Sequence, residues 1–319
     1  MWSAGVLVSV FLAEIALQGP WTVLLGKRRV IQNLKRYGPQ NHLRDKQNTP
    51  TMGGVVFLLI TLLAGLSLFL LGRWTLRDAV LLLGFPLTGG AIGLADDLLK
   101  FFRSSSEGLR SLQKFVLQLF AALVWSYVYI PDGLLVLAPG ITLEGISGRA
   151  ILIFFLVGAL NAANISDGLD GLLSGMAAMS FAVLLILTPE GEADQLAAIL
   201  GLGLSAGFLA HNFHPAKVFM GDCGSHFLGG LLVSVCAARG MLLLILPLGF
   251  MMGLEVVSVI IQIIAIRGFN KKVFLMSPLH HHFEMSGWSE KSVVYSFWAL
   301  HAAGMVLLLK LLGDILICP

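Results

Sequence analysis

The sequence predicts an all-α, polytopic integral membrane protein, and three observations lead to this fold class. Hydrophobic residues make up 57% of the 319-residue chain and charged residues only 12%, a balance typical of membrane proteins. Apolar stretches of roughly 17 to 25 residues recur along the chain, each long enough to cross a bilayer as a helix. Most of the 21 Lys and Arg residues fall in alternate connections between these stretches, as expected when successive helices cross a membrane in opposite directions.

We expect about ten membrane-spanning helices within a single catalytic domain that covers residues 1–319. The first span follows Met1 without a basic leader or a cleavage site, so we expect it to be retained. The fifth is short, and the eighth runs almost directly into the ninth. The predicted spans are 3–25, 52–72, 79–95, 115–131, 149–164, 172–188, 195–211, 224–240, 241–266 and 293–312.

The distribution of basic residues predicts the orientation in the membrane. Basic connections stay in the cytoplasm, whereas the loop at 188–195 on the other side is acidic. Both termini are then external, and the cytoplasmic face suits anionic substrates and lipid head groups. We expect no nucleic-acid partner. The predicted cytoplasmic loops lie near 26–51, 96–114, 165–171, 212–223 and 267–292.

Acidic residues mark the ends of the apolar runs on this cytoplasmic face. Asp96 and Asp97 end the third span, and on a continuing helix Lys100 lies beside both carboxylates at i+3 and i+4. Asp222 stands between nearby glycines just before a helix start, which suits oxygen coordination of a hard cation near phosphate. A solvated helix end is the alternative for the motif of Asp96, Asp97 and Lys100 taken alone.

A second acidic motif follows the fifth span in the segment Asn164–Gly171. Asp167 and Asp170 alternate there with Gly168 and Gly171, which interrupt a helix and allow a diphosphate to approach backbone amides. A plain turn is the alternative, since Gly, Asn and Asp favour turns. Three acidic clusters on one face, with lysines 46, 100, 114 and 217 among them, indicate a metal-assisted phosphate site.

Three consecutive histidines, His280, His281 and His282, occupy the last cytoplasmic loop. Successive residues of a helix point about 100° apart, so a regular helix cannot turn all three toward one ion. We expect hydrogen bonding to a phosphate or a polar substrate arm rather than a zinc site. Glu255, Ser258 and Gln262 share one helix face and predict a polar seam that reaches the same site.

Five motifs together resemble the phospho-N-acetylmuramoyl-pentapeptide transferase (MraY) family of the polyprenyl-phosphate N-acetylhexosamine-1-phosphate transferase superfamily. The resemblance runs in order from about residue 20 to residue 312. The motifs are Thr49–Gly54, Asp96–Lys100, Asn164–Gly171, Val218–Asp222 and His280–Glu284.

The resemblance implies a Mg²⁺-dependent enzyme of the bacterial cytoplasmic membrane, with ten helices and commonly a homodimer. Such an enzyme moves phospho-MurNAc-pentapeptide from UDP-MurNAc-pentapeptide to undecaprenyl phosphate, giving lipid I and UMP. Asp222 resembles the magnesium ligand, and Asp96 and Asp97 resemble the catalytic pair, with Asp96 as the candidate base. Residues resembling the nucleotide pocket are Asn164, Asp167, Gly168, Leu169, Asp170, Asn212, Phe219 and Gln262; those resembling the remaining polar lining are Lys46, Thr51, Lys100, Lys114, His280, His281 and His282.

Chemistry limits the mechanism, because transfer between two phosphates joins two anions and requires cations to neutralise the charge. We expect direct attack by the lipid phosphate, with an aspartyl-phosphate intermediate as the alternative. Three other functions remain open: a relative that uses UDP-GlcNAc, an intramembrane prenyltransferase and a transporter. A transporter is expected to place its acids midspan along a pathway rather than at one surface.

Overall fold

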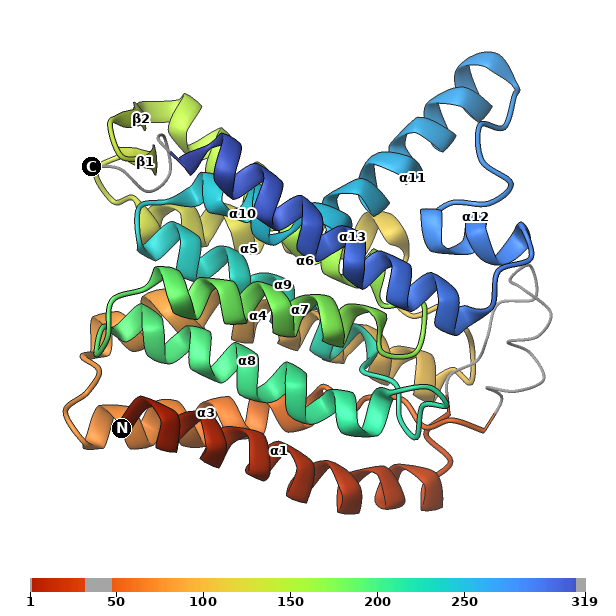
Figure 1. The fold of residues 1–319 in the computed structure, drawn as a ribbon, viewed down its shortest axis with the longest axis horizontal. Helices are drawn as coiled ribbons and strands as arrows, with labels where there is room; N and C mark the ends of the chain where they lie inside the picture. Colours follow the sequence, from red (N-terminus) through yellow and green to blue (C-terminus); the bar gives the residue numbers. More distant parts are fainter. Residues whose placement is uncertain (1, 32–47, 314–319) are drawn as a thin grey trace.

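The computed structural model describes residues 2–31 and 48–313 of the chain, and helices dominate it (Figure 1). Its elements, in order, are α1 (Trp2–Lys27), α3 (Val55–Leu70), α4 (Leu76–Phe102), α5 (Ser111–Tyr129), β1 (Leu135–Ala138), β2 (Ile141–Leu143), α6 (Gly145–Ser166), α7 (Leu172–Leu187), α8 (Ala193–Asn212), α9 (Gly221–Ala238), the 3₁₀ turn η1 (Leu242–Leu244), α10 (Ile245–Leu248), α11 (Phe250–Phe269), α12 (Leu279–Met285) and α13 (Glu290–Leu311).

Among the described residues, seven helices are long and apolar enough to cross a membrane: α1, α4, α5, α6, α8, α11 and α13. The helices α3 and α7 are apolar but shorter. Outward-facing apolar side chains fit a lipid environment: Leu66 on α3, Phe120 on α5 and Ile264 on α11 are each more than half exposed. The prediction of a polytopic, mainly helical membrane protein is therefore confirmed, and ten crossings remain a prediction.

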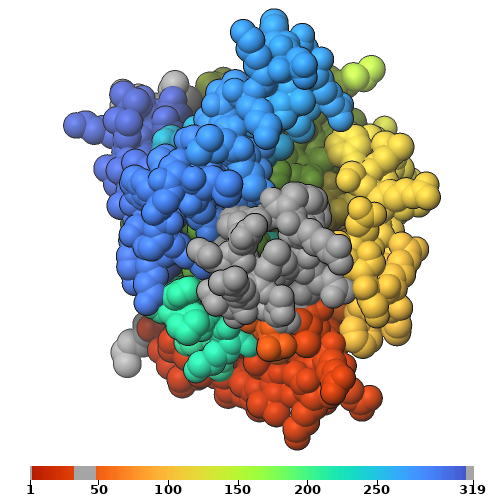
Figure 2. Space-filling model, turned by 90° about the vertical axis from the view of Figure 1, so that its right-hand side faces the viewer, coloured from red at the N-terminus to blue at the C-terminus, as the bar shows by residue number. Residues whose placement is uncertain are grey.

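The helices lie side by side and alternate in direction (Figure 1). The start of α1 and the end of α13 lie together at one end of the bundle, on the left in Figure 1. We call the opposite end, where α4 finishes and α9 begins, the basic end. Figure 2 looks onto this basic end. Its basic residues are Lys27, Arg28, Arg29, Lys100, Arg103, Arg110, Lys114, Lys217, Arg267, Lys271, Lys272 and Lys291.

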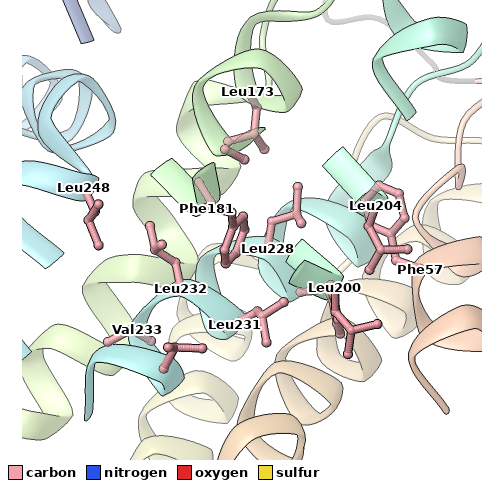
Figure 3. Packing of buried hydrophobic residues seen from close by; sticks show 14 of the residues in the cluster. Phe57, Leu173, Phe181, Leu200, Leu204, Leu228, Leu231, Leu232, Val233 and Leu248 are labelled. Carbon is pink, nitrogen blue, oxygen red and sulfur yellow. The ribbon is translucent and has the colours of Figure 1, made fainter. Parts of the chain in front are cut away.

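Helix α9 runs through the centre of the bundle and packs against α4, α6, α8 and α3. Its side chains Leu228, Leu231 and Leu232 are buried and meet Phe181 of α7 (Figure 3). Glycine and serine occur along α9 as well, which permits neighbouring backbones to come close in a membrane bundle. The first turn of α9 is therefore held from several sides.

Three local features differ from the sequence predictions. The span predicted at 241–266 is not one helix: η1 and α10 precede α11, and the break falls at Gly249, two residues after Pro247. Proline and glycine both disfavour a continuous helix. The connection near 132–148 contains an antiparallel hairpin of β1 and β2, a small exception to the all-α class. The loop predicted at 267–292 contains the short helix α12.

Candidate functional site

Three carboxylates meet at the basic end, where the end of α4 crosses the start of α9. One oxygen from each of Asp96, Asp97 and Asp222 lies within 4.8 Å of the others. The Asp96 and Asp97 side chains are only 3% and 2% exposed, whereas that of Asp222 is 16% exposed. The structure thus brings Asp222 next to two acids that precede it in the sequence by more than 120 positions. Asp222 is the most accessible of the three.

Two lysines accompany these acids, and we call the five residues the carboxylate–lysine cluster. Lys100 Nζ lies 2.7 Å from Asp96 Oδ2 and 2.9 Å from Asp222 Oδ2. Lys114 Nζ, on α5, lies 2.5 Å from the same Asp222 oxygen. The cluster therefore brings three carboxyl groups and two ammonium groups into contact.

Asp97 anchors the first turn of α9. Its Oδ1 accepts a hydrogen bond from the Asp222 amide at 3.2 Å, and its Oδ2 accepts one from the Cys223 amide at 3.0 Å. A helix start leaves such amides without intrahelical partners, and a carboxylate there is favoured by the helix dipole. Gly221, which precedes them, has a φ of 75°, a conformation that glycine adopts without strain.

Glycines allow the surrounding helices to reach Asp222. A Cβ on Gly93 of α4 would lie 2.1 Å from the Asp222 carbonyl oxygen, and a Cβ on Gly54 would lie 2.2 Å from the Gly224 backbone. Real Cβ atoms do not approach backbone atoms so closely, so any side chain would displace the start of α9. The last glycine of the Thr49–Gly54 motif therefore has a packing role.

Asn164, at the end of α6, orients the accessible carboxylate. Its Nδ2 donates to Asp222 Oδ1 at 2.8 Å and to Ser225 Oγ at 3.1 Å. Asp222 itself lies just before the predicted span 224–240 and so outside that predicted membrane-spanning segment. Burial raises the pKa of its carboxyl, but Lys114 and Lys100 outweigh burial and hold this pKa well below its usual range.

A second acidic group ties three segments together, and we call it the loop cluster. Asp170 Oδ2 accepts from the Ala216 amide and contacts His214 Nδ1, each at 3.0 Å. Glu290, at the start of α13, accepts from the Asp170 amide at 2.8 Å and lies 3.5 Å from His214 Nδ1. Asp170 therefore lies apart from the carboxylate–lysine cluster, in a group that joins two loops to α13.

Asn212 also joins loops. Its Oδ1 accepts from the Gly171 amide and its Nδ2 donates to the Val218 carbonyl, both at 2.9 Å. Gly171 has a φ of 79° and lies between α6 and α7. The predicted interruption of the helix at 168–171 is thus confirmed, and Asp167 caps the end of α6.

The three histidines have different partners. His280 Nδ1 contacts Glu255 Oε1 at 3.0 Å, and its Nε2 lies against Gly168. His281 Nδ1 pairs with Glu284, and His282 Nδ1 accepts from the Leu275 amide. The three side chains therefore face different partners, as expected from the angle of about 100° between successive residues of a helix.

The predicted polar seam on α11 meets the last loop. The Glu255 carboxylate accepts from the Leu279 and His280 amides and so caps α12. The Gln262 amide bonds the backbone of Val273 and Phe274. Both side chains position the loop that carries the histidines.

The predicted residues that remain to be located are Thr51, Leu169, Phe219 and Lys46. Backbone bonds join the Thr49–Gly54 motif to the 219–220 segment: the Phe219 amide donates to the Pro50 carbonyl, and the Gly53 amide donates to the Phe219 carbonyl. Thr51 and Leu169 are largely buried. Lys46 lies outside the residues that the structure describes.

The sequence interpretation missed three polar residues beneath the cluster: Gln118, Asn161 and His226. Their side chains are linked by hydrogen bonds and connect to the Asp222 backbone. The signal available was spacing, since Gln118 follows Lys114 and His226 follows Asp222 by four residues, so each pair shares a helix face.

The donor set of the carboxylate–lysine cluster indicates its chemistry. All three carboxyl groups offer oxygen, which hard cations such as Mg²⁺ prefer. The two lysines next to Asp222, the most accessible of the three acids, suit phosphate oxygens. The arrangement can hold a metal ion beside an anionic group at the membrane surface.

Comparison with known proteins agrees with this chemistry. The model of glycosyl transferase family 4 matches residues 79–240, and signature 1 of the phospho-N-acetylmuramoyl-pentapeptide-transferases matches residues 46–58. A phospho-N-acetylmuramoyl-pentapeptide-transferase of Oceanobacillus iheyensis is 38% identical over 301 residues, or 92% of each chain. That of Bacillus subtilis is 38% identical over 310 residues, covering 95% of this chain and 93% of the relative. That of a Thermoanaerobacter species is 39% identical over 313 residues, covering 94% and 95%.

Proposed function

The chain belongs to the phospho-N-acetylmuramoyl-pentapeptide-transferase family, and from this membership we propose the reaction that it catalyses. Phospho-MurNAc-pentapeptide moves from UDP-MurNAc-pentapeptide to undecaprenyl phosphate. The products are UMP and lipid I, an intermediate of peptidoglycan synthesis. A multi-pass membrane protein suits this reaction because the acceptor is a lipid whose phosphate lies at the membrane surface.

The observation that carries the proposal is the placement of the carboxylate–lysine cluster. Asp96, Asp97 and Asp222 gather at the end of the bundle and not midway along it. A transporter requires polar groups along a path through the membrane, so this placement favours surface chemistry. Lys100 and Lys114, which contact Asp222, are proposed to neutralise the charge that accumulates when two phosphates approach each other.

We propose that Asp222 holds Mg²⁺, because it is the most exposed oxygen donor of the cluster. The ion, when bound, neutralises diphosphate oxygens and stabilises the departing UMP. Asn164 fixes one Asp222 oxygen and Lys114 contacts the other. These contacts limit the orientations of the carboxylate and prepare it for a ligand.

The two buried acids support direct transfer. Both Asp97 oxygens accept backbone amides of α9, so Asp97 acts by positioning Asp222. Asp96 Oδ1 accepts from the Leu109 amide at 2.7 Å, and its burial limits attack on phosphorus. We retain Asp96 as the candidate base for the lipid phosphate, which then attacks the β-phosphorus of the sugar nucleotide.

The nucleotide-sugar pocket is proposed to lie beside this cluster, along the segments joined by Asn212. It comprises Asn164, Asp167, Gly168, Leu169, Asp170, Asn212, Phe219 and Gln262, with Lys46, Thr51, His280, His281 and His282 as further polar lining. Phe219 is proposed to stack on uracil. The contacts of His280 with Gly168 and Glu255 support a link between the nucleotide loop and the histidine loop.

We propose that the basic end faces the cytoplasm of a bacterial inner membrane. Few basic residues lie at the other end, namely Arg73, Arg77, Arg149, Arg239 and Lys310, and positive residues favour the cytoplasmic side. Both ends of the described chain would then be external, and the helices would make ten crossings. Homodimer formation is a further part of the proposal, to be tested by cross-linking in native membranes.

The decisive experiment measures UMP release by the purified protein with UDP-MurNAc-pentapeptide, undecaprenyl phosphate and Mg²⁺. We expect release that stops when EDTA is added and is not reduced by excess UDP-GlcNAc. UMP release from UDP-GlcNAc at an equal rate would contradict the assignment of UDP-MurNAc-pentapeptide as the substrate. Exchange of labelled UMP into the sugar nucleotide without the lipid acceptor would contradict direct transfer and favour a covalent intermediate.

A further inference from the structure

A second polar group lies directly beneath the carboxylate–lysine cluster. His226 Nδ1 lies 2.6 Å from the Asp222 carbonyl oxygen, and its Nε2 lies 2.8 Å from Gln118 Nε2. Asn161 Nδ2 donates to Gln118 Oε1 at 2.7 Å. Gln118 and His226 are 1% and 0% exposed, and Asn161 is partly buried.

The two groups are built as tiers from the same three helices. On α5, Gln118 follows Lys114 by four residues; on α9, His226 follows Asp222 by four. On α6, Asn161 precedes Asn164 by three. Such spacings put side chains on one face about one helical turn apart. The upper tier is Lys114, Asn164 and Asp222, and the lower tier is Gln118, Asn161 and His226.

Donor and acceptor can be assigned for each hydrogen bond of the lower tier. A carbonyl oxygen only accepts, so Nδ1 of His226 carries the proton toward Asp222. Nε2 then accepts from Gln118, whose Oε1 accepts from Asn161. A rotation of any of the three helices would leave a buried polar group unpaired, which is costly in an apolar interior.

We propose that the lower tier is a positioning device for the metal-binding carboxylate. Gln118 joins α5, α6 and α9, so it fixes their rotation one turn below Lys114, Asn164 and Asp222. The three lower residues touch no substrate, and they act through the Asp222 backbone and the helix faces. The inference rests on the proposed function, which assigns Mg²⁺ to Asp222.

The test is direct metal binding, measured by electron paramagnetic resonance during Mn²⁺ titration of the purified full-length protein in lipid nanodiscs. Gln118→Leu removes both bonds of the glutamine and retains a similar apolar volume. We expect Mn²⁺ affinity to fall about tenfold, the lower range for groups that orient metal ligands. His226→Leu in addition should weaken binding less than twofold further, since the tier acts as a unit.

Tyr129→Phe provides a matched control on the same helix pair. Tyr129 of α5 donates to Ser234 Oγ of α9 at 2.7 Å, far from Asp222 along both helices. This control should lower thermal stability and leave Mn²⁺ affinity within twofold. If Gln118→Leu fails to fold, His226→Leu alone carries the test, with the same comparison.

Two outcomes separate this inference from the proposed function. Mn²⁺ affinity within twofold of the unaltered protein in Gln118→Leu and His226→Leu, beside lost binding in Asp222→Ala, would overturn the positioning role alone. Full Mn²⁺ binding by Asp222→Ala would contradict the metal assignment and therefore the inference that rests on it.

Discussion

The carboxylate–lysine cluster and the loop cluster are both acidic groups at the basic end, yet their surroundings differ. In the first, Asp222 faces two ammonium groups that are side chains, which can exchange partners when an anion or a cation binds. In the second, Asp170 and Glu290 contact backbone amides and His214. Side-chain partners suit ligand exchange, whereas backbone partners fix the path of the chain.

This comparison shows that proximity of acids alone does not identify a metal site. Each group offers three ligand atoms within 4.8 Å of one another. The Asp97 carboxylate, which belongs to the first cluster, also accepts two amides, so roles divide even inside one group. The following substitutions separate ligand binding from positioning, beginning with the largest expected effect.

Asp222→Ala should reduce UMP release by on the order of 10³-fold, because the carboxylate proposed to hold the metal ion is removed. The thermal unfolding temperature should change little, since Asp97 still accepts the amides of α9. Asp132→Ala, at an exposed position before β1, is the control and should retain full activity. Activity of Asp222→Ala within tenfold of the unaltered protein would remove Asp222 from the mechanism.

Lys114→Met should lower kcat by about 10²-fold, because charge that develops between two phosphates loses a neutralising cation. Lys114→Arg should restore part of the rate. Lys217→Met, at an exposed position near the loop cluster, should remain within twofold. Equal losses for the two methionine variants would show that general basicity, and not the Asp222 contact, determines the rate.

Asp97→Ala should destabilise the protein by about 1–3 kcal/mol, because two amides at the start of α9 lose a charged acceptor. Asp97→Asn keeps an acceptor oxygen and should lose less. Thermal unfolding in detergent measures this difference. An unchanged unfolding temperature in Asp97→Ala, together with lost activity, would indicate a direct chemical role for Asp97.

His214→Ala should raise KM for UDP-MurNAc-pentapeptide about fivefold, equivalent to about 1 kcal/mol for one lost hydrogen bond. The kcat should stay within twofold, because the loop cluster joins the segments proposed to bind the nucleotide and does not include the acids of the carboxylate–lysine cluster. Steady-state kinetics with varied nucleotide separates the two parameters. A drop in kcat at unchanged KM would show instead that the two clusters act as one catalytic unit.

The sequence was sufficient for much of this architecture. Apolar length and basic asymmetry predicted the membrane helices, and the spacing of Asp96, Asp97 and Lys100 predicted a contact that the structure contains. The break at Gly249 was not predicted because Pro247 and Gly249 lie inside a run that is apolar on both sides. In such a run hydropathy alone does not distinguish a broken helix from a continuous one.

Tertiary contacts were harder to predict than helices. Helical spacing placed Glu255 in a polar seam, but its partners on α12 are 24 and 25 residues away in the sequence. Gln118, Asn161 and His226 belong to three helices, and no local pattern states which helices are neighbours. Roles that depend on a contact between helices therefore required the structure.

The close glycine contact at Asp222 has a genetic consequence. Every missense change in the codons for Gly54, Gly93 and Gly224 adds a Cβ, and at each position the space for that atom is already filled. A cell under pressure from an inhibitor bound near Asp222 would find no tolerated replacement at these three codons. Resistance mutations are therefore expected in the surrounding loops, where the chain can change without moving α9.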